Sequence, residues 1–143
     1  MDSAFKARLK QLIVSHEDSR NYPYTDTKGN ITIGIGYNLS ARGLPDTWIN
    51  QQYDEDVEYF DQQLRHDFPW YDGLIDVRKM VLIDMCFRCY KTFCTFHKLI
   101  FALELRNNDK AADEILNSLY AEQAPNRALE NANIMRSGVY VPK

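Results

Sequence analysis

The stretch ITIGIGYN, from Ile31 to Asn38, shows the alternation of side chains that is typical of a β-strand. Isoleucines at 31, 33 and 35 alternate with Thr32, Gly34 and Gly36, so the two kinds of residue lie on opposite faces. We expect the isoleucine face to pack on the core. Glycine weakens strands and often marks the close approach of another backbone or a ligand. We therefore predict that the opposite face lines a binding site.

A short β-element surrounds this strand, and helices surround the β-element. Apolar residues before it follow helical spacing and predict a first helix that ends near Ser15 or His16; they are Phe5, Leu9, Leu12 and Ile13. Lys28-Gly29-Asn30 predicts a turn between two short strands. The chain thus reads as helix, small β-sheet and helical bundle, an α+β fold with one core.

The pattern is helical from Pro45 onward. Asp54 is the predicted cap of a helix that carries Val57, Phe60 and Leu64. Three more helices are predicted at about 72–85, 96–105 and 109–120. Pro125 suits the first turn of a last helix that ends at Gly138.

Length and composition favour one soluble globular domain. The chain has 143 residues, of which 45% are hydrophobic and 26% charged, and no segment reaches the length of an apolar membrane span. A net charge of −3 argues against a nucleic-acid partner, because such proteins concentrate basic residues. Charges at Lys6, Arg8 and Lys10 interrupt the apolar core that a signal peptide needs, so we expect export to depend on another protein.

Three cysteines lie within nine positions and are followed by His97. As C-x2-C-x4-C-x2-H, the residues Cys86, Cys89, Cys94 and His97 are ligand types that suit tetrahedral zinc. On one continuous helix, however, the first and last of them would lie about 16 Å apart. Their neighbours are apolar, and we expect the three cysteines to be reduced core residues without metal.

Two carboxylates and a hydroxyl flank the glycine strand. Glu17 follows the first helix, Asp26 lies nine positions on, and Thr32 follows six positions later. Hydrolysis of a sugar bond needs one carboxylic acid to protonate the leaving oxygen and one carboxylate to handle water. Each residue also has a simpler explanation, as a solvated glutamate, a turn aspartate and a strand-forming threonine.

Four segments together resemble the phage-type lysozymes, the endolysin muramidases of glycoside hydrolase family 24. They are HED at 16–18, YPYTDTKGNITIGIGYNL at 22–39, FPWYDGLIDVRKMVLIDMCF at 68–87 and QAPNRALENANIMRSGVY at 123–140. The resemblance implies a lysozyme-like fold with the active site in a cleft between a β-containing lobe and a helical lobe. It also implies hydrolysis of the β-1,4 bond between N-acetylmuramic acid and N-acetylglucosamine, with inversion and without a cofactor.

The resemblance assigns roles residue by residue. Glu17 is the implied general acid, and Asp26 and Thr32 are implied to hold the attacking water. An arginine that the family places beside the catalytic glutamate is Arg127 here. Positions that resemble substrate contacts in the family are Asn38, Phe87 and Tyr120.

One loop departs from the family pattern. Phe87-Arg88-Cys89-Tyr90 stands where the family usually reads F-N-L-G or F-Q-M-G, so the glycine that turns the chain is missing and Arg88 enters the expected cleft wall. This departure motivates an alternative, a lysozyme-like protein that binds glycan or a protein partner without catalysis.

The resemblance also predicts domain organisation and partners. We expect residues 1–143 to form one lysozyme-like domain, with a small lobe at about 16–53 and a helical lobe at about 54–143 that includes the N-terminal helix. The partner is the peptidoglycan glycan strand, and we expect a monomer without stable membrane insertion. The protein would stay in the host cytoplasm until a holin-type membrane partner opens a route to the periplasmic or extracellular cell wall.

Overall fold

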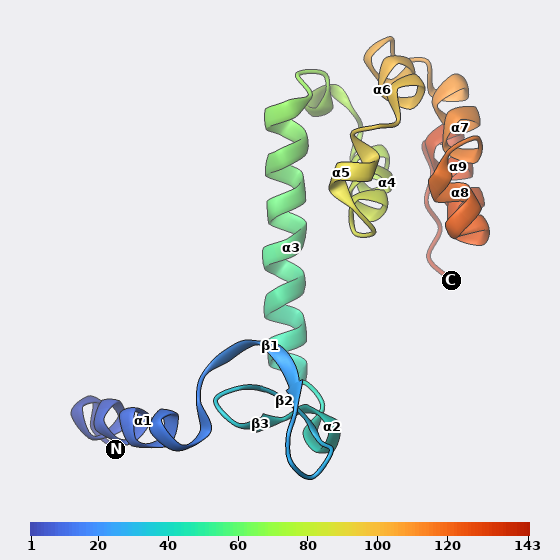
Figure 1. The fold of residues 1–143 in the computed structure, drawn as a ribbon. Helices are drawn as coiled ribbons and strands as arrows, with labels where there is room; N and C mark the ends of the chain where they lie inside the picture. The colour runs from blue at the N-terminus through green and yellow to red at the C-terminus, as the bar shows by residue number, and fades with distance from the viewer. The chain divides into compact units, whose positions relative to one another are not determined.

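A computed structural model describes residues 1–143 and divides them into two compact units, Met1–Gln51 and Gln52–Lys143. The fold is α+β, as predicted: an N-terminal helix and a three-stranded antiparallel sheet precede a mostly helical region (Figure 1). The boundary between the units falls inside helix α3 (Asp46–Asp67). The single lysozyme-like domain with its two lobes stays a prediction.

The first unit begins with α1 (Ser3–Glu17), where the side chain of Asp2 accepts a hydrogen bond from the Phe5 N–H at 2.8 Å. The helix includes Glu17, which we expected just beyond its end. The sheet follows in the order β1-β2-β3, and a four-residue helix closes the unit before α3. Their bounds are β1 Arg20–Thr25, β2 Ile31–Gly34, β3 Tyr37–Asn38 and α2 Leu39–Arg42.

The stretch ITIGIGYN is not one strand, which corrects the prediction. Strand β2 ends at Gly34, and the chain turns through Ile35 and Gly36 before β3. Gly34 and Gly36 adopt φ of +65° and +64°, a conformation that other L-residues adopt at a cost, so these glycines make the turn. The burial prediction was also wrong, because Ile31 is 48% exposed and Thr32 is 5% exposed. Alternation predicts two faces, but not which face is covered.

Helix α3 begins at Asp46, eight residues before the predicted cap Asp54. The Pro45 carbonyl accepts hydrogen bonds from the N–H groups of Trp48 and Ile49, which starts the helix. The apolar side chains of these first turns are exposed, so no buried stripe marks them in the sequence. Leu64 is the only buried residue of α3.

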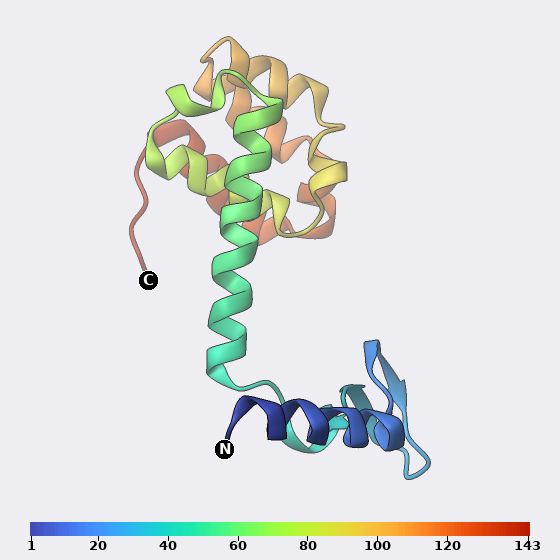
Figure 2. The same ribbon diagram turned by 90° about the vertical axis from the view of Figure 1, so that its left-hand side faces the viewer.

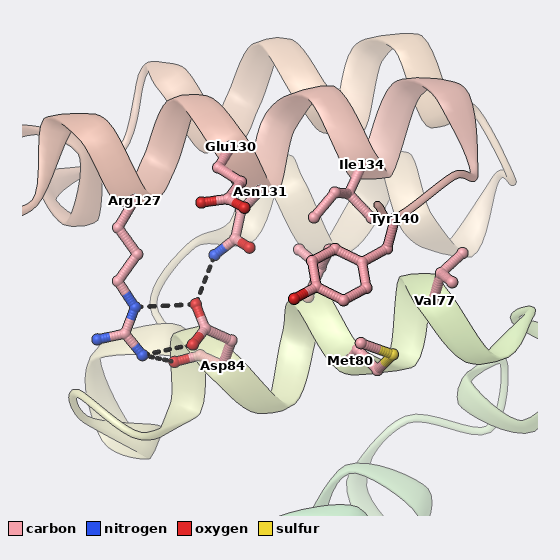
Figure 3. Close-up of a pocket in the computed structure, with 9 residues that line it drawn as sticks. Val77, Met80, Asp84, Arg127, Glu130, Asn131, Ile134 and Tyr140 are labelled. Atoms are coloured by element: carbon pink, nitrogen blue, oxygen red, sulfur yellow. Dashed lines mark hydrogen bonds and ion pairs between the residues drawn. The ribbon is translucent and has the colours of Figure 1, made fainter. Parts of the chain in front are cut away.

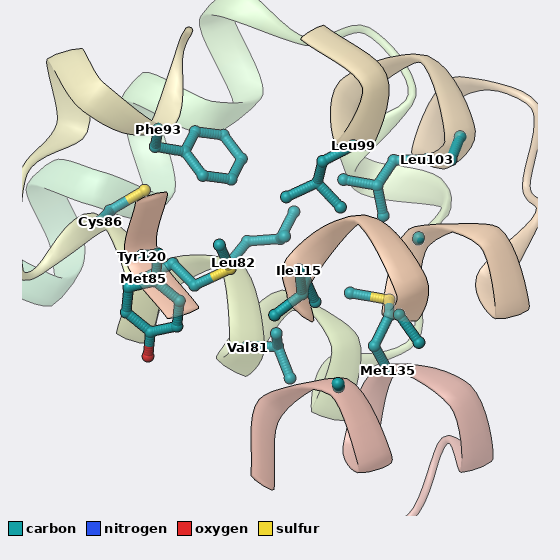
Figure 4. Close-up of a cluster of buried hydrophobic side chains, with 14 of the residues drawn as sticks. Val81, Leu82, Met85, Cys86, Phe93, Leu99, Leu103, Ile115, Tyr120 and Met135 are labelled. Atoms are coloured by element: carbon teal, nitrogen blue, oxygen red, sulfur yellow. The ribbon is translucent and has the colours of Figure 1, made fainter. Parts of the chain in front are cut away.

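The second unit is helical and contains the hydrophobic core (Figure 4). Its elements after α3 are η1 Tyr71–Gly73, α4 Asp76–Cys86, α5 Tyr90–Phe93, α6 His97–Glu104, α7 Asn108–Leu116, α8 Leu119–Gln123 and α9 Pro125–Ser137. Helix α7 packs on α6 and α9, and α4 packs on α9. Side chains such as Leu82, Leu99, Ile115 and Met135 fill the space between them, and each fully buried aliphatic side chain of this size contributes about 1.5–3 kcal/mol.

Helix boundaries in this unit confirm some predictions and correct others. Helix α9 ends at Gly138, whose φ of +71° and N–H bond to the Ile134 carbonyl (2.8 Å) form the predicted left-handed cap. The helix predicted at 109–120 is instead two helices, because the chain breaks at Asn117 and Ser118. After Gly138 the tail turns back along α9, and Lys143 Nζ lies 3.6 Å from Glu130 Oε2 (Figure 2). None of the helices combines the length and apolar character that crossing a bilayer requires.

Candidate functional site

Glu17 lies at the last position of α1, where the helix stops abruptly. Asp18 takes a positive φ of 68°, and its N–H donates to the Val14 carbonyl at 2.8 Å. The side chain of Glu17 is exposed and makes no hydrogen bond or ion pair in the structure. Its carboxyl group is therefore available to a ligand.

Gly36 lies next to the Glu17 side chain. A β-carbon built on Gly36 would stand 2.8 Å from Glu17 Oε2 and 3.1 Å from Glu17 Cγ, which is closer than van der Waals contact allows. A β-carbon on Gly34 would meet nothing within 4 Å. The second glycine of the turn thus makes room for the carboxyl group at the end of α1.

Asp26 organises the turn between β1 and β2. Its Oδ1 accepts from the N–H groups of Lys28 (2.9 Å) and Asn30 (2.8 Å), and its Oδ2 accepts from the Asn30 side-chain amide at 3.3 Å. The hydrogen bond from the Asn30 N–H, helped by the one from Lys28, holds the pKa of the Asp26 carboxyl below its ordinary value. Asp26 is therefore ionised near neutral pH, and Oδ2 retains the freer acceptor sites.

Thr32 lies in the middle of the sheet, between Tyr24 of β1 and Asn38 of β3. Its hydroxyl donates to the Asn30 carbonyl at 3.3 Å. Asn38 Oδ1 accepts from the Ala41 N–H at 3.0 Å and so caps α2, while its side-chain N–H₂ donates no hydrogen bond within the protein. The predicted residues Thr32 and Asn38 are thus direct cross-strand neighbours.

The first unit therefore brings three of its four predicted site residues together, Asp26 and Thr32 through Asn30 and Asn38 through Thr32. Asn30 donates to Asp26 and accepts from Thr32, and Thr32 pairs with Asn38. No hydrogen bond or ion pair joins Glu17 to this group. Glu17 instead lies against Gly36, in the turn between β2 and β3.

Arg127 forms a hydrogen-bonded network in the second unit (Figure 3). It projects from the first turn of α9, and Nε donates to Asp84 Oδ2 at 2.9 Å while Nη2 bonds Asp84 Oδ1 and the Asp84 carbonyl. Asn131, one turn further along α9, donates to Asp84 Oδ2 at 2.7 Å and to the Tyr120 hydroxyl at 2.9 Å. The role of Arg127 beside Glu17 stays a prediction, because the two residues lie in different units.

Asp84 is the centre of this network, and the sequence reasoning missed it. Burial acts to raise its pKa, but the hydrogen bonds from Arg127 and Asn131 outweigh burial and hold the pKa below its ordinary value. Burial and the neighbouring Asp84 charge raise the pKa of Tyr120 to about 12, so its hydroxyl stays protonated. The available signal was the lone charge in the apolar run VLIDMCF.

Phe87 and Tyr120, the predicted substrate contacts of the second unit, line the same pocket of about 350 Å³. Arg88, in the loop between α4 and α5, lines it too. A separate pocket of about 390 Å³ is lined by both Phe87 and Arg127. The second unit thus places Phe87 where these two pockets adjoin.

The three cysteines do not lie on one helix, because α4 ends at Cys86 and α5 begins at Tyr90. Cys86 is buried and Cys94 is half-buried, but Cys89 is exposed, which corrects the prediction that all three belong to the core. Burial raises the pKa of the Cys86 thiol. No group of three or more His, Cys, Asp or Glu side chains is arranged to hold a metal ion.

Comparison with known protein families adds no assignment, because no family model matches the chain.

Proposed function

We propose that this protein is a peptidoglycan hydrolase, a muramidase that cleaves the β-1,4 bond between N-acetylmuramic acid and N-acetylglucosamine and so lyses bacterial cells. The observation that carries the proposal is the contact between Glu17 and Gly36. The Glu17 carboxyl group has no hydrogen-bond or ion-pair partner and lies against Gly36, where any larger residue would displace it. The lysozyme-like sequence segments support the same function.

Glu17 is the general acid in this proposal. A carboxyl group without internal partners can donate its proton to the oxygen of the leaving sugar, and no rearrangement of other hydrogen bonds is needed first.

Asp26 and Thr32 handle the attacking water. Asp26 is ionised, and its Oδ2 retains acceptor capacity beyond the weak contact to Asn30. The Thr32 hydroxyl can exchange its 3.3 Å bond to Asn30 for a water. Asn38, Phe87, Tyr120 and Arg127 are the proposed substrate contacts.

A second candidate, glycan binding without turnover, has one observation in its favour. Asp26 already serves the turn with both oxygens, and Thr32 is almost fully buried, so the simpler explanations of these two residues also fit. In that case Glu17 would have no partner to activate water.

Turnover on purified sacculi tests the proposal. We expect the wild-type chain to release soluble fragments with new reducing ends, and Glu17→Gln to lose about 100- to 10 000-fold in rate, because an amide cannot protonate the leaving oxygen. Glu104→Gln is a matched control, because Glu104 is also the exposed last residue of a helix. Saccharide binding without release of reducing ends would favour the second candidate.

A further inference from the structure

One pocket of the second unit combines aromatic walls with a single charge. It has a volume of about 350 Å³, within the range of ligand sites, and lies at the end of α4 beside α5 and α8. Its aromatic lining includes Phe87, Phe96 and Tyr120, and its polar lining includes Arg88, Thr92 and Gln123. Two hydrogen bonds hold the Tyr120 ring in place: its hydroxyl donates to Asp84 Oδ2 and accepts from the Asn131 side-chain amide.

Arg88 is the only Lys, Arg, Asp or Glu side chain in this lining. Its guanidinium is exposed and makes no hydrogen bond or ion pair, whereas Arg65 and Arg136 are each paired with aspartates. A guanidinium without an internal acid presents its fork of donors to solvent, and this fork matches a carboxylate. The charge of the pocket therefore fits an anionic ligand.

The other polar groups fit a peptide. The Thr92 hydroxyl and the Gln123 amide can bond the N–H and C=O groups of a short chain, and the aromatic faces can cover its apolar parts. Peptidoglycan offers such a ligand, because each glycan strand carries short peptide stems with free carboxylates. Phe87 and Tyr120, which we propose as substrate contacts, line this same pocket.

We infer that this pocket binds a carboxylate of the peptide stem and that Arg88 is a specificity-determining residue, which selects glycan with acidic stems. The inference rests on the proposed muramidase function and adds to it. Recognition of the stem carboxylate makes substrate choice depend on the charge of the peptide as well as on the sugar.

Sacculi with altered stem charge test the inference. Coupling with carbodiimide and ammonia converts the stem carboxylates to amides and leaves the glycan unchanged. We expect wild type to cleave untreated sacculi about three- to tenfold faster than amidated sacculi, as one partly exposed charge-assisted hydrogen-bond pair allows. The Arg88→Gln variant should cleave both kinds of sacculi at the same rate. Because Arg88 is exposed, we expect the substitution to leave the melting temperature unchanged, which checks that the variant is folded.

Lys91→Gln is the matched control. Lys91 is exposed, lies three residues from Arg88 and does not line the pocket, so this variant loses the same charge and should keep the wild-type preference. Equal wild-type rates on the two sacculi would overturn the inference while leaving the muramidase function standing. So would a preference that Arg88→Gln retains.

A titration that needs no turnover separates the two proposals. We expect N-acetyl-L-alanyl-D-glutamate to shift the amide resonances of Arg88, Thr92 and Gln123, whereas its diamide, or either peptide with Arg88→Gln, should not. If no sacculus is cleaved but these shifts appear, the muramidase proposal fails and the carboxylate pocket stands. The absence of shifts with the diacid overturns the pocket assignment.

Discussion

The Glu17 side chain lies so close to Gly36 that residue 36 has no room for a β-carbon. A β-carbon at this position would stand 2.8 Å from Glu17 Oε2. This contact ties the last residue of α1 to the turn that joins β2 and β3. Glycine at position 36 thus leaves room for a carboxyl group that has no hydrogen bond or ion pair of its own.

Gly36→Ala tests whether this contact matters for activity. The added methyl group must displace Glu17, and misplacement of a catalytic group by about 1 Å can cost roughly 100-fold, so we predict a loss of at least about tenfold in turnover. Gly34→Ala is the control, because Gly34 has nearly the same positive φ and no neighbour within 4 Å. Both variants should lose about 1–2 kcal/mol of stability from backbone strain, measured by urea unfolding. Equal activity in the two would show that Gly36 serves the turn alone.

Thr32→Val tests the hydroxyl. The substitution keeps the volume and branching of a side chain that is 5% exposed, so the fold should persist. We predict a rate loss of roughly 10- to 1000-fold, about 1.4 to 4 kcal/mol of barrier, if the hydroxyl positions water. Thr25→Val, at an exposed position of β1, should leave the rate unchanged. A rate for Thr32→Val equal to wild type would leave Thr32 as a strand former only.

The fold was predictable where a local rule decides it. Gly138 ends α9 as a left-handed cap, and Lys28-Gly29-Asn30 closes the turn that Asp26 organises. The start of α3 was not predictable in this way, because Trp48 and Ile49 are apolar and exposed and give no amphipathic stripe. The alternation in ITIGIGYN predicted β-structure but did not reveal the turn at residues 35–36, because glycine occurs in both strands and turns.

The grouping of the candidate site residues was predictable only where they share one local element. Asp26, Thr32 and Asn38 lie in one β-element, so their order along the chain already brings them close. Asp84 and Arg127 are 43 residues apart, and their pairing depends on how α4 packs on α9. No local pattern encodes such a contact, and only the folded structure reveals it.

The Asp84 network should make stability depend on acidic pH. The folded-state pKa of Asp84 lies below its ordinary value of 3.8, so its stabilising contribution is complete above that value and is lost as pH falls through the lower folded-state pKa. We predict that Asp84→Asn is less stable than wild type at pH 7 and that the difference shrinks below about pH 4.

Urea unfolding between pH 2 and 7 measures this dependence. Other carboxyl groups titrate in both proteins, so the difference between wild type and variant isolates Asp84. The double variant Asp84→Asn, Arg127→Gln completes the cycle, and its coupling energy gives the strength of the pair. A difference that stays constant with pH would mean that Asp84 keeps its ordinary pKa.

In the proposed muramidase reaction, the stereochemistry of cleavage depends on whether Asp26 attacks the sugar or holds a water molecule. A nucleophilic carboxylate must reach the anomeric carbon itself, which gives two displacements and retention, whereas a carboxylate that only holds water gives inversion. Asp26 Oδ1 is fixed by the N–H groups of Lys28 and Asn30, and these bonds stabilise its charge. A carboxylate stabilised and anchored in this way is a poor nucleophile but a suitable holder of water. Thr32, linked to it through Asn30, offers a second group for the same water.

We therefore predict inversion. The first product from the β-linked glycan should be the α-anomer, which proton NMR distinguishes before mutarotation mixes the two forms. Glu17→Gln is the control for background hydrolysis and should accumulate neither anomer on this time scale. Early accumulation of the β-anomer, or a trapped glycosyl ester on Asp26, would show that Asp26 is the nucleophile and that Thr32 holds no attacking water.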